Sequence, residues 1–260
     1  MFYFLIFVFG LVIGSFLNVV IFRLRSGEKI VNSRSHCRSC KKQLTFKDLI
    51  PLVSFVWQKG RCRYCGAKIS WQYPLVELVT GLLFVAATFN IIGNLGAGML
   101  FYNSDIFFNW LKSLVFISFL VVIFVYDLKW LLILDKITLP AGILALAFNL
   151  FLGISWKSLL LGVVVGLGFF LIQFLVSRGR WIGGGDLRLA VVMGLMLGWP
   201  KILVALFFAY IIGALIALIL MAWGKRGLKS QVPFGTFLSL GTLVAIFWGE
   251  EIIKWYLSLV

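Results

Sequence analysis

The sequence predicts an all-α protein that crosses a membrane about eight times, with a small cysteine-containing loop domain after the first crossing. Three observations predict this fold class. The chain of 260 residues is 62% hydrophobic and only 13% charged, whereas soluble domains carry about 25% charged residues. Its apolar residues form long runs that approach the roughly 20 residues a spanning helix needs. Its basic residues, which give a net charge of +15, flank those runs.

Eight apolar segments are expected to be membrane helices. They span residues 2–22, 74–93, 113–130, 137–156, 158–177, 189–200, 202–224 and 232–249. The first has no basic residue before it and no small-residue cleavage site after it, so it is expected to be a permanent span and not a cleaved signal peptide. The sixth would form only about 18 Å of helix against a hydrocarbon core of about 30 Å. The glycine-rich loop before it is therefore expected to dip into the bilayer.

The basic residues predict the orientation. If the N-terminus lies outside and the chain alternates, 20 of the 24 Lys and Arg residues fall in the inside segments 23–73, 127–136, 178–188 and 225–231. Because positive charge concentrates in cytoplasmic loops, both termini are expected outside. This distribution explains the high positive charge without nucleic acid, which is not expected as a partner. The chain then divides into a first transmembrane helix (1–22), a cytoplasmic loop domain (23–73) and a transmembrane domain (74–260).

All four cysteines lie in the first inside loop, as Cys37-x-x-Cys40 and Cys62-x-x-Cys65. Two such pairs at this separation fit a four-thiolate zinc site, which leaves no coordination position for water. A structural Zn²⁺ is therefore expected, and the surrounding Arg and Lys residues are expected to favour thiolates. The alternatives are two disulfides, which a reducing compartment disfavours, or four unrelated thiols.

Two aspartates stand at the inner ends of predicted helices. Asp127 follows a run of uncharged residues, and Asp186 follows Gly183, Gly184 and Gly185. Two carboxylates that meet share a proton, so that one activates water while the other donates a hydrogen bond to a peptide carbonyl. Gly183 and Gly185 are expected to let a substrate backbone approach and to permit a positive φ beside Asp186.

The alternative is that these aspartates are interfacial charges that end helices, Asp127 beside Lys129 and Asp186 beside Arg188. Glu77 lies in the first turn of the second predicted helix, where the helix dipole favours an acidic side chain. A structural role is expected for it.

At these residues the sequence resembles the type IV prepilin peptidases, a family of bacterial inner-membrane aspartic proteases, over nearly the whole chain. The matching motifs are the run 14–24, both cysteine pairs, the runs 50–55, 60–65 and 73–78, Asp127 eight residues before the run 135–140, the Gly-Gly-Gly-Asp-Leu-Arg run 183–188, and the Val-Pro-Phe-Gly-Thr-Phe run 232–237. Arg188 stands where the family has lysine, and Leu134 where it has proline.

The resemblance implies that Asp127 and Asp186 remove the basic leader from prepilins or pseudopilins at the cytoplasmic face of the bacterial inner membrane. It also implies S-adenosylmethionine-dependent methylation of the new N-terminus. The residues themselves reveal no methyl-donor site, and Glu77 with the loop around it is the best candidate region. Pilin precursors and membrane lipids are the expected partners. Two other interpretations remain: an intramembrane aspartyl protease of the signal-peptide-peptidase kind, and a non-enzymatic transporter or scaffold.

Overall fold

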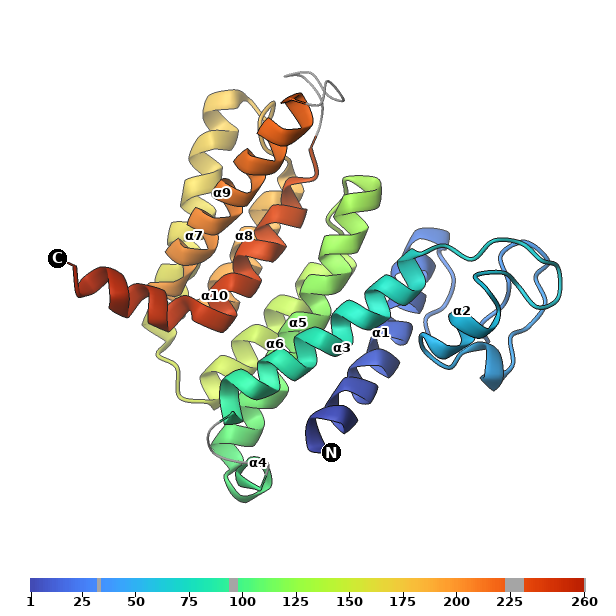
Figure 1. Cartoon of the computed structure of the whole chain (residues 1–260). Helices are drawn as coiled ribbons and strands as arrows, with labels where there is room; N and C mark the ends of the chain where they lie inside the picture. The colour runs from blue at the N-terminus through green and yellow to red at the C-terminus, as the bar shows by residue number, and fades with distance from the viewer. Residues whose placement is uncertain (32–33, 94–97, 223–231, 260) are drawn as a thin grey trace. The chain divides into compact units, whose positions relative to one another are not determined.

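The computed structural model covers the whole chain and describes every residue except 32–33, 94–97, 223–231 and 260. The described residues are helical, with two isolated β-bridges (Figure 1). The helices are α1 (Phe2–Ser26), the 3-10 helix η1 (Phe46–Asp48), α2 (Val53–Trp57), α3 (Gln72–Ile92), α4 (Met99–Tyr102), α5 (Ser104–Trp130), α6 (Asp135–Phe151), α7 (Trp156–Ser177), α8 (Gly184–Leu197), α9 (Lys201–Ala222) and α10 (Phe234–Leu257).

The predicted all-helical membrane fold is confirmed. Each of the eight predicted segments corresponds to a helix, namely α1, α3, α5, α6, α7, α8, α9 and α10. Among the described residues, six of these are long and apolar enough to cross a membrane. The other two are α6, with 17 residues, and α8, with 14. The predicted basic loop at 225–231 and the end of the seventh segment, at 223–224, lie outside the described residues.

The start of α8 differs from the prediction. The helix begins at Gly184, five residues before the predicted start at Leu189, so Gly184 and Gly185 lie in the first helical turn and not in a loop. The reason is local capping, because the carboxylate of Asp186 accepts a hydrogen bond from the backbone N–H of Gly183 at 3.1 Å. A first-turn acidic residue that reaches back to the N-cap backbone initiates a helix despite the poor helix propensity of glycine.

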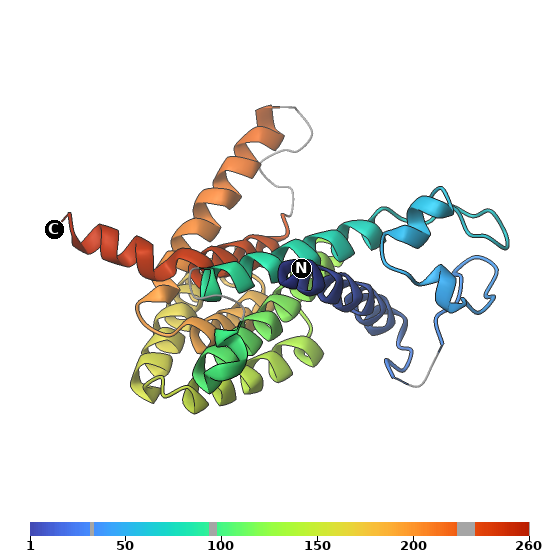
Figure 2. The ribbon, with the colours of Figure 1, turned by 60° about the horizontal axis from the view of Figure 1, so that its bottom comes forward.

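The contacts divide the chain into two compact units, Met1–Ile106 and Phe107–Val260. In the first unit α1 packs along α3. Gly10 and Gly14 stand one turn apart on α1, and a Cβ at Gly10 would lie 2.7 Å from the Cα of Gly81. Small residues at this spacing let two membrane helices approach closely. The cysteine loop extends beyond the ends of this helix pair, as Figures 1 and 2 show.

In the second unit the short helix α8 packs against α6, α7 and α10, while α9 packs against α10. Its residues Leu189, Ala190 and Met193 are fully buried. The amide Nδ2 of Asn149 on α6 donates to the last carbonyls of α8, those of Leu195 at 2.6 Å and Met196 at 3.1 Å. Where water is absent, the free backbone N–H and C=O groups at a helix end must form hydrogen bonds with other parts of the protein. Protein on several sides and this capping amide explain how a 14-residue helix sits inside a membrane bundle.

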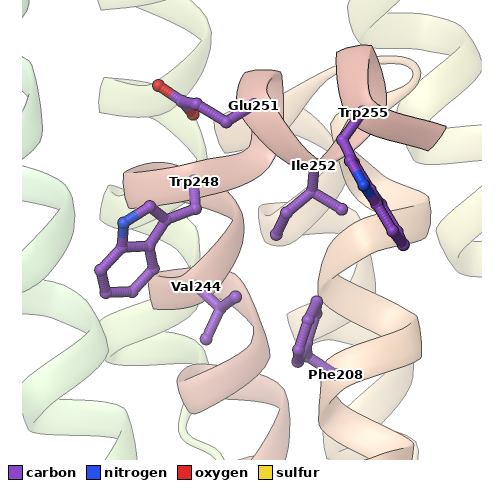
Figure 3. A pocket seen from close by; sticks show the side chains of 6 residues that line it. All are labelled: Phe208, Val244, Trp248, Glu251, Ile252 and Trp255. Carbon is purple, nitrogen blue, oxygen red and sulfur yellow. The ribbon is translucent and has the colours of Figure 1, made fainter. Parts of the chain in front are cut away.

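A groove of about 490 Å³ lies against α9 and the C-terminal half of α10 (Figure 3). It is lined by Phe208, Val244, Trp248, Glu251, Ile252 and Trp255. Figure 3 shows the carboxylate of Glu251 directed away from the apolar side chains, so the lining is almost entirely apolar. Trp248 and Trp255 are exposed, as expected of tryptophans near a membrane interface. None of the residues singled out from the sequence lines this groove.

Candidate functional site

Asp127 lies in the last turn of α5 and is only 4% exposed. Its Oδ2 accepts two hydrogen bonds from Thr236, one from the backbone N–H at 2.8 Å and one from the hydroxyl at 3.2 Å. Thr236 stands in the first turn of α10 and is equally buried. The C-terminal end of a helix disfavours an anion, and the N-terminal end of a second helix favours one. The N-terminus of α10 therefore compensates for the unfavourable position of Asp127 on α5.

Asp186 is the third residue of α8 and is 9% exposed. Its Oδ2 accepts from the N–H of Gly183, and its own N–H donates to the carbonyl of Gly183, both at 3.1 Å. The predicted positive φ beside Asp186 is wrong. Gly183 has φ −81°, and neither Gly184 nor Gly185 has a positive φ. Both of these glycines lie inside the first helical turn, which explains their ordinary backbone angles.

The structure brings the two aspartates together around Ile133, in the segment between α5 and α6. A Cβ at Gly185 would lie 3.0 Å from the Cβ of Ile133, and a Cβ at Gly235 would lie 2.7 Å from its Cδ1. The N-termini of α8 and α10 therefore pack against the same side chain. Asp127 is close enough to Asp186 for its charge to act on that carboxylate. This is the arrangement expected of a pair that shares a proton.

The glycines before Asp186 differ in what surrounds them. A side chain at Gly185 would meet Ile133, whereas at Gly183 the nearest atom is Oδ2 of Asp186, at 3.5 Å. At Gly184 a Cβ would meet no atom of the structure within 4 Å. At Gly185 the close approach is therefore made by Ile133 of the protein itself and not by a substrate. Room for a substrate backbone lies beside Gly183 and Gly184.

Aromatic rings gather beside Asp186. Tyr210 on α9 is close enough for the charge of Asp186 to act on it, and its hydroxyl donates to Oε1 of Gln173 at 2.9 Å. The ring of Tyr210 lies 6.4 Å from that of Phe170 and 5.2 Å from that of Phe234. Phe170 is fully buried. One side of the pair is therefore apolar, which strengthens electrostatic interactions there.

The interfacial alternative for Asp186 does not match the structure. Arg188, the proposed partner, bonds instead to Asp135 at the start of α6, with 2.5 Å between Nη1 and Oδ1. Both of these side chains are about half exposed. An exposed ion pair contributes little stability, so its effect is to hold Arg188 away from the buried carboxylate. Asp135 is the first residue of α6, a position where an acidic side chain is favoured by the helix dipole.

The four cysteines form one cluster. The Sγ atoms of Cys37, Cys40, Cys62 and Cys65 all lie within 4.8 Å of one another. Those of Cys37 and Cys65 are 3.8 Å apart, which equals the edge of a sulfur tetrahedron around Zn²⁺ at a Zn–S distance of about 2.3 Å. The donor set and its spacing therefore fit a four-coordinate metal ion. No disulfide joins these four cysteines.

The two cysteine pairs have the same local backbone. In each, the N–H of the residue after the second cysteine, Lys41 or Gly66, donates to the carbonyl of the first cysteine, at 2.9 and 2.8 Å. That residue has a positive φ in both, 60° at Lys41 and 71° at Gly66. Each turn directs its two sulfurs to a common point, so the repeated turn explains how the sequence pattern produces a cluster.

The neighbours of the Cys65 thiol act on its pKa in opposing directions. A hydrogen bond from the N–H of Ala67 lowers the pKa of the Cys65 thiol, but desolvation and the neighbouring thiols of Cys40, Cys62 and Cys37 raise that pKa to about 11. A bound cation would reverse the balance, because metal binding displaces thiol protons.

Asp48 connects the segment between the cysteine pairs to the second pair, and sequence reasoning missed it. Its Oδ2 accepts from the N–H and hydroxyl of Thr45, at 2.9 and 2.7 Å, and from the hydroxyl of Tyr64 at 3.3 Å. Its Oδ1 accepts from Gln58 at 3.1 Å. Desolvation acts to raise the pKa of Asp48. The bonds from Thr45, the charge of Arg63 and the bond from Tyr64 together lower this pKa by more, so the net pKa lies below its ordinary value.

Glu77 anchors the loop to the membrane helix α3. Its buried Oε2 accepts a hydrogen bond from the N–H of Leu52 at 2.9 Å. Leu52 has φ 58°, a conformation that is strained for a branched residue and that surrounding contacts must hold in place. On the other side of the loop the guanidinium of Arg38 stacks on Phe22, 3.4 Å from the ring centroid. The predicted place of Glu77 in the first helical turn is wrong, because α3 begins at Gln72 and has no acidic residue in its first turn. Its structural role comes instead from the hydrogen bond that holds Leu52.

Four residues of the site were not identified as functional from the sequence: Ile133, Gly235, Thr236 and Asp48. Gly235 and Thr236 belong to the Pro-Phe-Gly-Thr run that the resemblance singled out, so their position was signalled but their contact with Asp127 was not. Asp48 carried a weaker signal, a Thr-x-x-Asp spacing typical of a capping box. Nothing in the sequence distinguishes Ile133 from other apolar residues.

Comparisons with known proteins match both units. A family model described as the bacterial peptidase A24 N-terminal domain matches residues 8–91, and one described as the type IV leader peptidase family matches residues 114–218. Proteins named prepilin leader peptidase/N-methyltransferase are similar over most of the chain. The one from Bacillus subtilis is 34% identical over 98% of both chains. The one from Aeromonas hydrophila is 31% identical over 98% of this chain and 93% of its own. No solved structure matches.

Proposed function

We propose that this chain, which belongs to the type IV leader peptidase family, removes the leader peptide of prepilins or pseudopilins by hydrolysis at Asp127 and Asp186. The observation that carries the proposal is the meeting of two buried carboxylates, from the end of α5 and the start of α8, within a membrane bundle. Buried carboxylates in such a place are costly unless they share a proton. That shared-proton state is what water-activating peptidases use.

The reaction needs no covalent intermediate. One ionised carboxylate accepts a proton from water as the water oxygen adds to the carbonyl carbon of the scissile peptide bond. The protonated carboxyl donates its proton to the carbonyl oxygen, which gives a neutral gem-diol. As the C–N bond breaks, the carboxyl that gained a proton from water passes it to the leaving nitrogen, and one gem-diol hydroxyl returns its proton to the other carboxylate. The products are a leader with a new carboxyl group and a mature protein with a new amine.

The relatives' names include N-methyltransferase, and we propose the same second reaction for this chain. S-adenosylmethionine would supply the methyl group for the new amine. Two polar side chains near the cysteine loop are already bonded within the protein, since Glu77 holds Leu52 and Gln58 holds Asp48. These residues do not form a recognisable methyl-donor site, and no step is assigned to them.

The ion that the four cysteines hold is proposed to be Zn²⁺. Four thiolates at tetrahedral spacing are a ligand set that zinc prefers, and they leave no position for a reacting water. Its role would then be structural, holding the two cysteine turns of Cys37 and Cys62 together. The aspartates in the second unit would supply the hydrolytic chemistry.

We propose a bacterial inner-membrane location with both termini outside and the aspartates facing the cytoplasm. The distribution of basic residues supports this orientation. Two of the lysines assigned to the outside, Lys112 and Lys201, lie close enough to interact, and Lys201 bonds to Glu250 at 2.6 Å. The division into a first helix (1–22), a loop domain (23–73) and a transmembrane domain (74–260) stays part of this proposal.

The proposal is tested by incubating the purified full-length chain with a synthetic prepilin, with and without S-adenosylmethionine, and weighing the products. Cleavage on the N-terminal side of the apolar helix, followed by a gain of one methyl group only when S-adenosylmethionine is present, is the expected result. Cleavage within the apolar helix instead would favour a signal-peptide-peptidase type of enzyme. An intact substrate would favour the non-enzymatic interpretations.

A further inference from the structure

The two aspartates are held by different numbers of hydrogen-bond donors. Oδ2 of Asp127 accepts both the backbone N–H and the hydroxyl of Thr236. Oδ2 of Asp186 accepts the backbone N–H of Gly183. Hydrogen bonds that are donated to a carboxylate favour its charged form. The backbone N–H of Gly235 also bonds to Asp127. Of the donors that make the two environments unequal, the hydroxyl of Thr236 is the one that a side chain carries.

The other titratable groups around the pair do not cancel this difference. From α8 the group facing Asp127 is Asp186, and from α9 the group within range of Asp186 is Tyr210, which is neutral at physiological pH. Arg188, farther along α8, is occupied by Asp135. The environments of Asp127 and Asp186 therefore differ mainly in the hydrogen bonds that Gly235 and Thr236, at the start of α10, donate to Asp127.

We infer that Thr236 is a positioning residue that makes Asp127 the ionised member of the pair and leaves the proton on Asp186. This inference rests on the proposed function. It assigns the roles that the pair alone leaves open: Asp127 activates the water, and Asp186 donates to the peptide carbonyl. Because both bonds from Thr236 go to Oδ2, they also fix the plane of the carboxylate and present Oδ1 of Asp127 to the water.

The assignment predicts which limb of the pH profile depends on Thr236. A shared-proton pair gives a bell-shaped rate profile, whose acid limb reports the first ionisation and whose alkaline limb the second. If Asp127 ionises first, losing a donor to it raises the acid-limb pKa and leaves the alkaline limb in place. If Asp186 ionises first, the second ionisation belongs to Asp127, so the alkaline limb moves instead.

Thr236→Val tests this, because it removes the hydroxyl and keeps the shape and the backbone N–H. The acid limb of kcat for leader cleavage is expected to move up by about one pH unit, the equivalent of one hydrogen bond to a charged group. Activity at a pH on that limb then falls about tenfold. Thr236→Ser restores a hydroxyl and is expected to return the wild-type profile, which a loss of packing alone would not do.

Thr242→Val is the matched control. Thr242 lies on the same helix, is fully buried, and its hydroxyl donates only along the helix, to the carbonyl of Leu238 at 2.7 Å. Its loss is expected to leave both limbs in place. An unchanged profile for Thr236→Val, or a shift confined to the alkaline limb, would overturn the inference. A wild-type protein that does not cleave prepilin at all would instead overturn the proposed function, so the two failures are distinguishable.

A second measurement uses the unmodified protein and covers the case in which Thr236→Val does not fold. Epoxides are opened by ionised carboxylates and diazo compounds by protonated carboxyls. We expect an active-site-directed epoxide to esterify Asp127 and a diazo reagent to esterify Asp186, as identified by mass spectrometry of the peptides. The reverse pattern of labelling would overturn the assignment.

Discussion

Gly235→Ala is predicted to damage catalysis although it removes none of the proposed catalytic groups. An added Cβ would lie 3.0 Å from Oδ2 of Asp127 and 2.7 Å from Cδ1 of Ile133. Non-bonded carbon atoms prefer separations of about 3.5–4.0 Å, so the carboxylate, Ile133 or the start of α10 must move by several tenths of an ångström. A displacement of about 1 Å in a reacting group costs on the order of 100-fold in rate.

We therefore expect kcat for leader cleavage to fall by roughly 10- to 100-fold, with a smaller change in KM. Overpacking is also expected to cost about 1–3 kcal/mol of stability. Gly168→Ala on α7 is the matched control. No atom of the structure lies within 4 Å of the Cβ position at Gly168, so this substitution is expected to leave kcat unchanged.

The assay is initial-rate cleavage of a synthetic prepilin by wild type and both variants in the same detergent, with thermal unfolding measured in parallel. A Gly235→Ala protein that folds and cleaves at the wild-type rate would refute the claim that the approach of α10 to Asp127 sets the catalytic geometry. Equal losses in both alanine variants would point to a general effect of glycine replacement.

Three further outcomes are expected of the cysteine loop. Metal analysis of the purified chain is expected to find one Zn²⁺ per chain, which Cys62→Ser loses; a metal-free wild type would rule this out. Cys62→Ser is expected to keep measurable leader removal while N-methylation falls or disappears, because four-thiolate zinc has no open position for water; loss of cleavage in a folded variant would contradict this division. Asp48→Asn is expected to cost about 1–3 kcal/mol at pH 7, against no loss for the exposed Glu28→Gln. The folded-state pKa of Asp48 is lowered. Its contribution to stability is therefore fully present above about pH 4, the unfolded value, and is lost as the pH falls through the lower folded value. A difference in melting temperature between wild type and Asp48→Asn that does not shrink at acid pH would refute this.

Much of the membrane fold was predictable because hydropathy and charge are summed over whole segments. All eight predicted segments are helices, and the runs around α1 and α3 were placed within a few residues. The predicted helix boundaries were wrong where a local contact, and not the average hydropathy of the segment, determines where the helix begins. α8 begins at Gly184 because Asp186 caps it, and α5 begins at Ser104, nine residues before the predicted start.

The candidate site was predictable at residues whose type is energetically unfavourable in their surroundings unless they have a partner. Asp127, Asp186 and the four cysteines stand out for that reason. The contacts around them were not predictable, since Thr236 lies 109 residues from Asp127 in the chain. Ile133 has an ordinary apolar side chain whose importance comes only from the two helix ends that pack on it.

The most direct test of the central claim is the cleavage rate of Asp127→Asn and Asp186→Asn in full-length protein that inserts and folds as wild type does. Asparagine keeps the size of each side chain but can neither accept the proton from water nor donate a carboxyl proton. Each variant is expected to lose at least about 10²- to 10⁴-fold in rate, the contribution of a positioned acid or base. Near-wild-type cleavage by either variant would contradict the account, because a pair that shares a proton cannot work with one member.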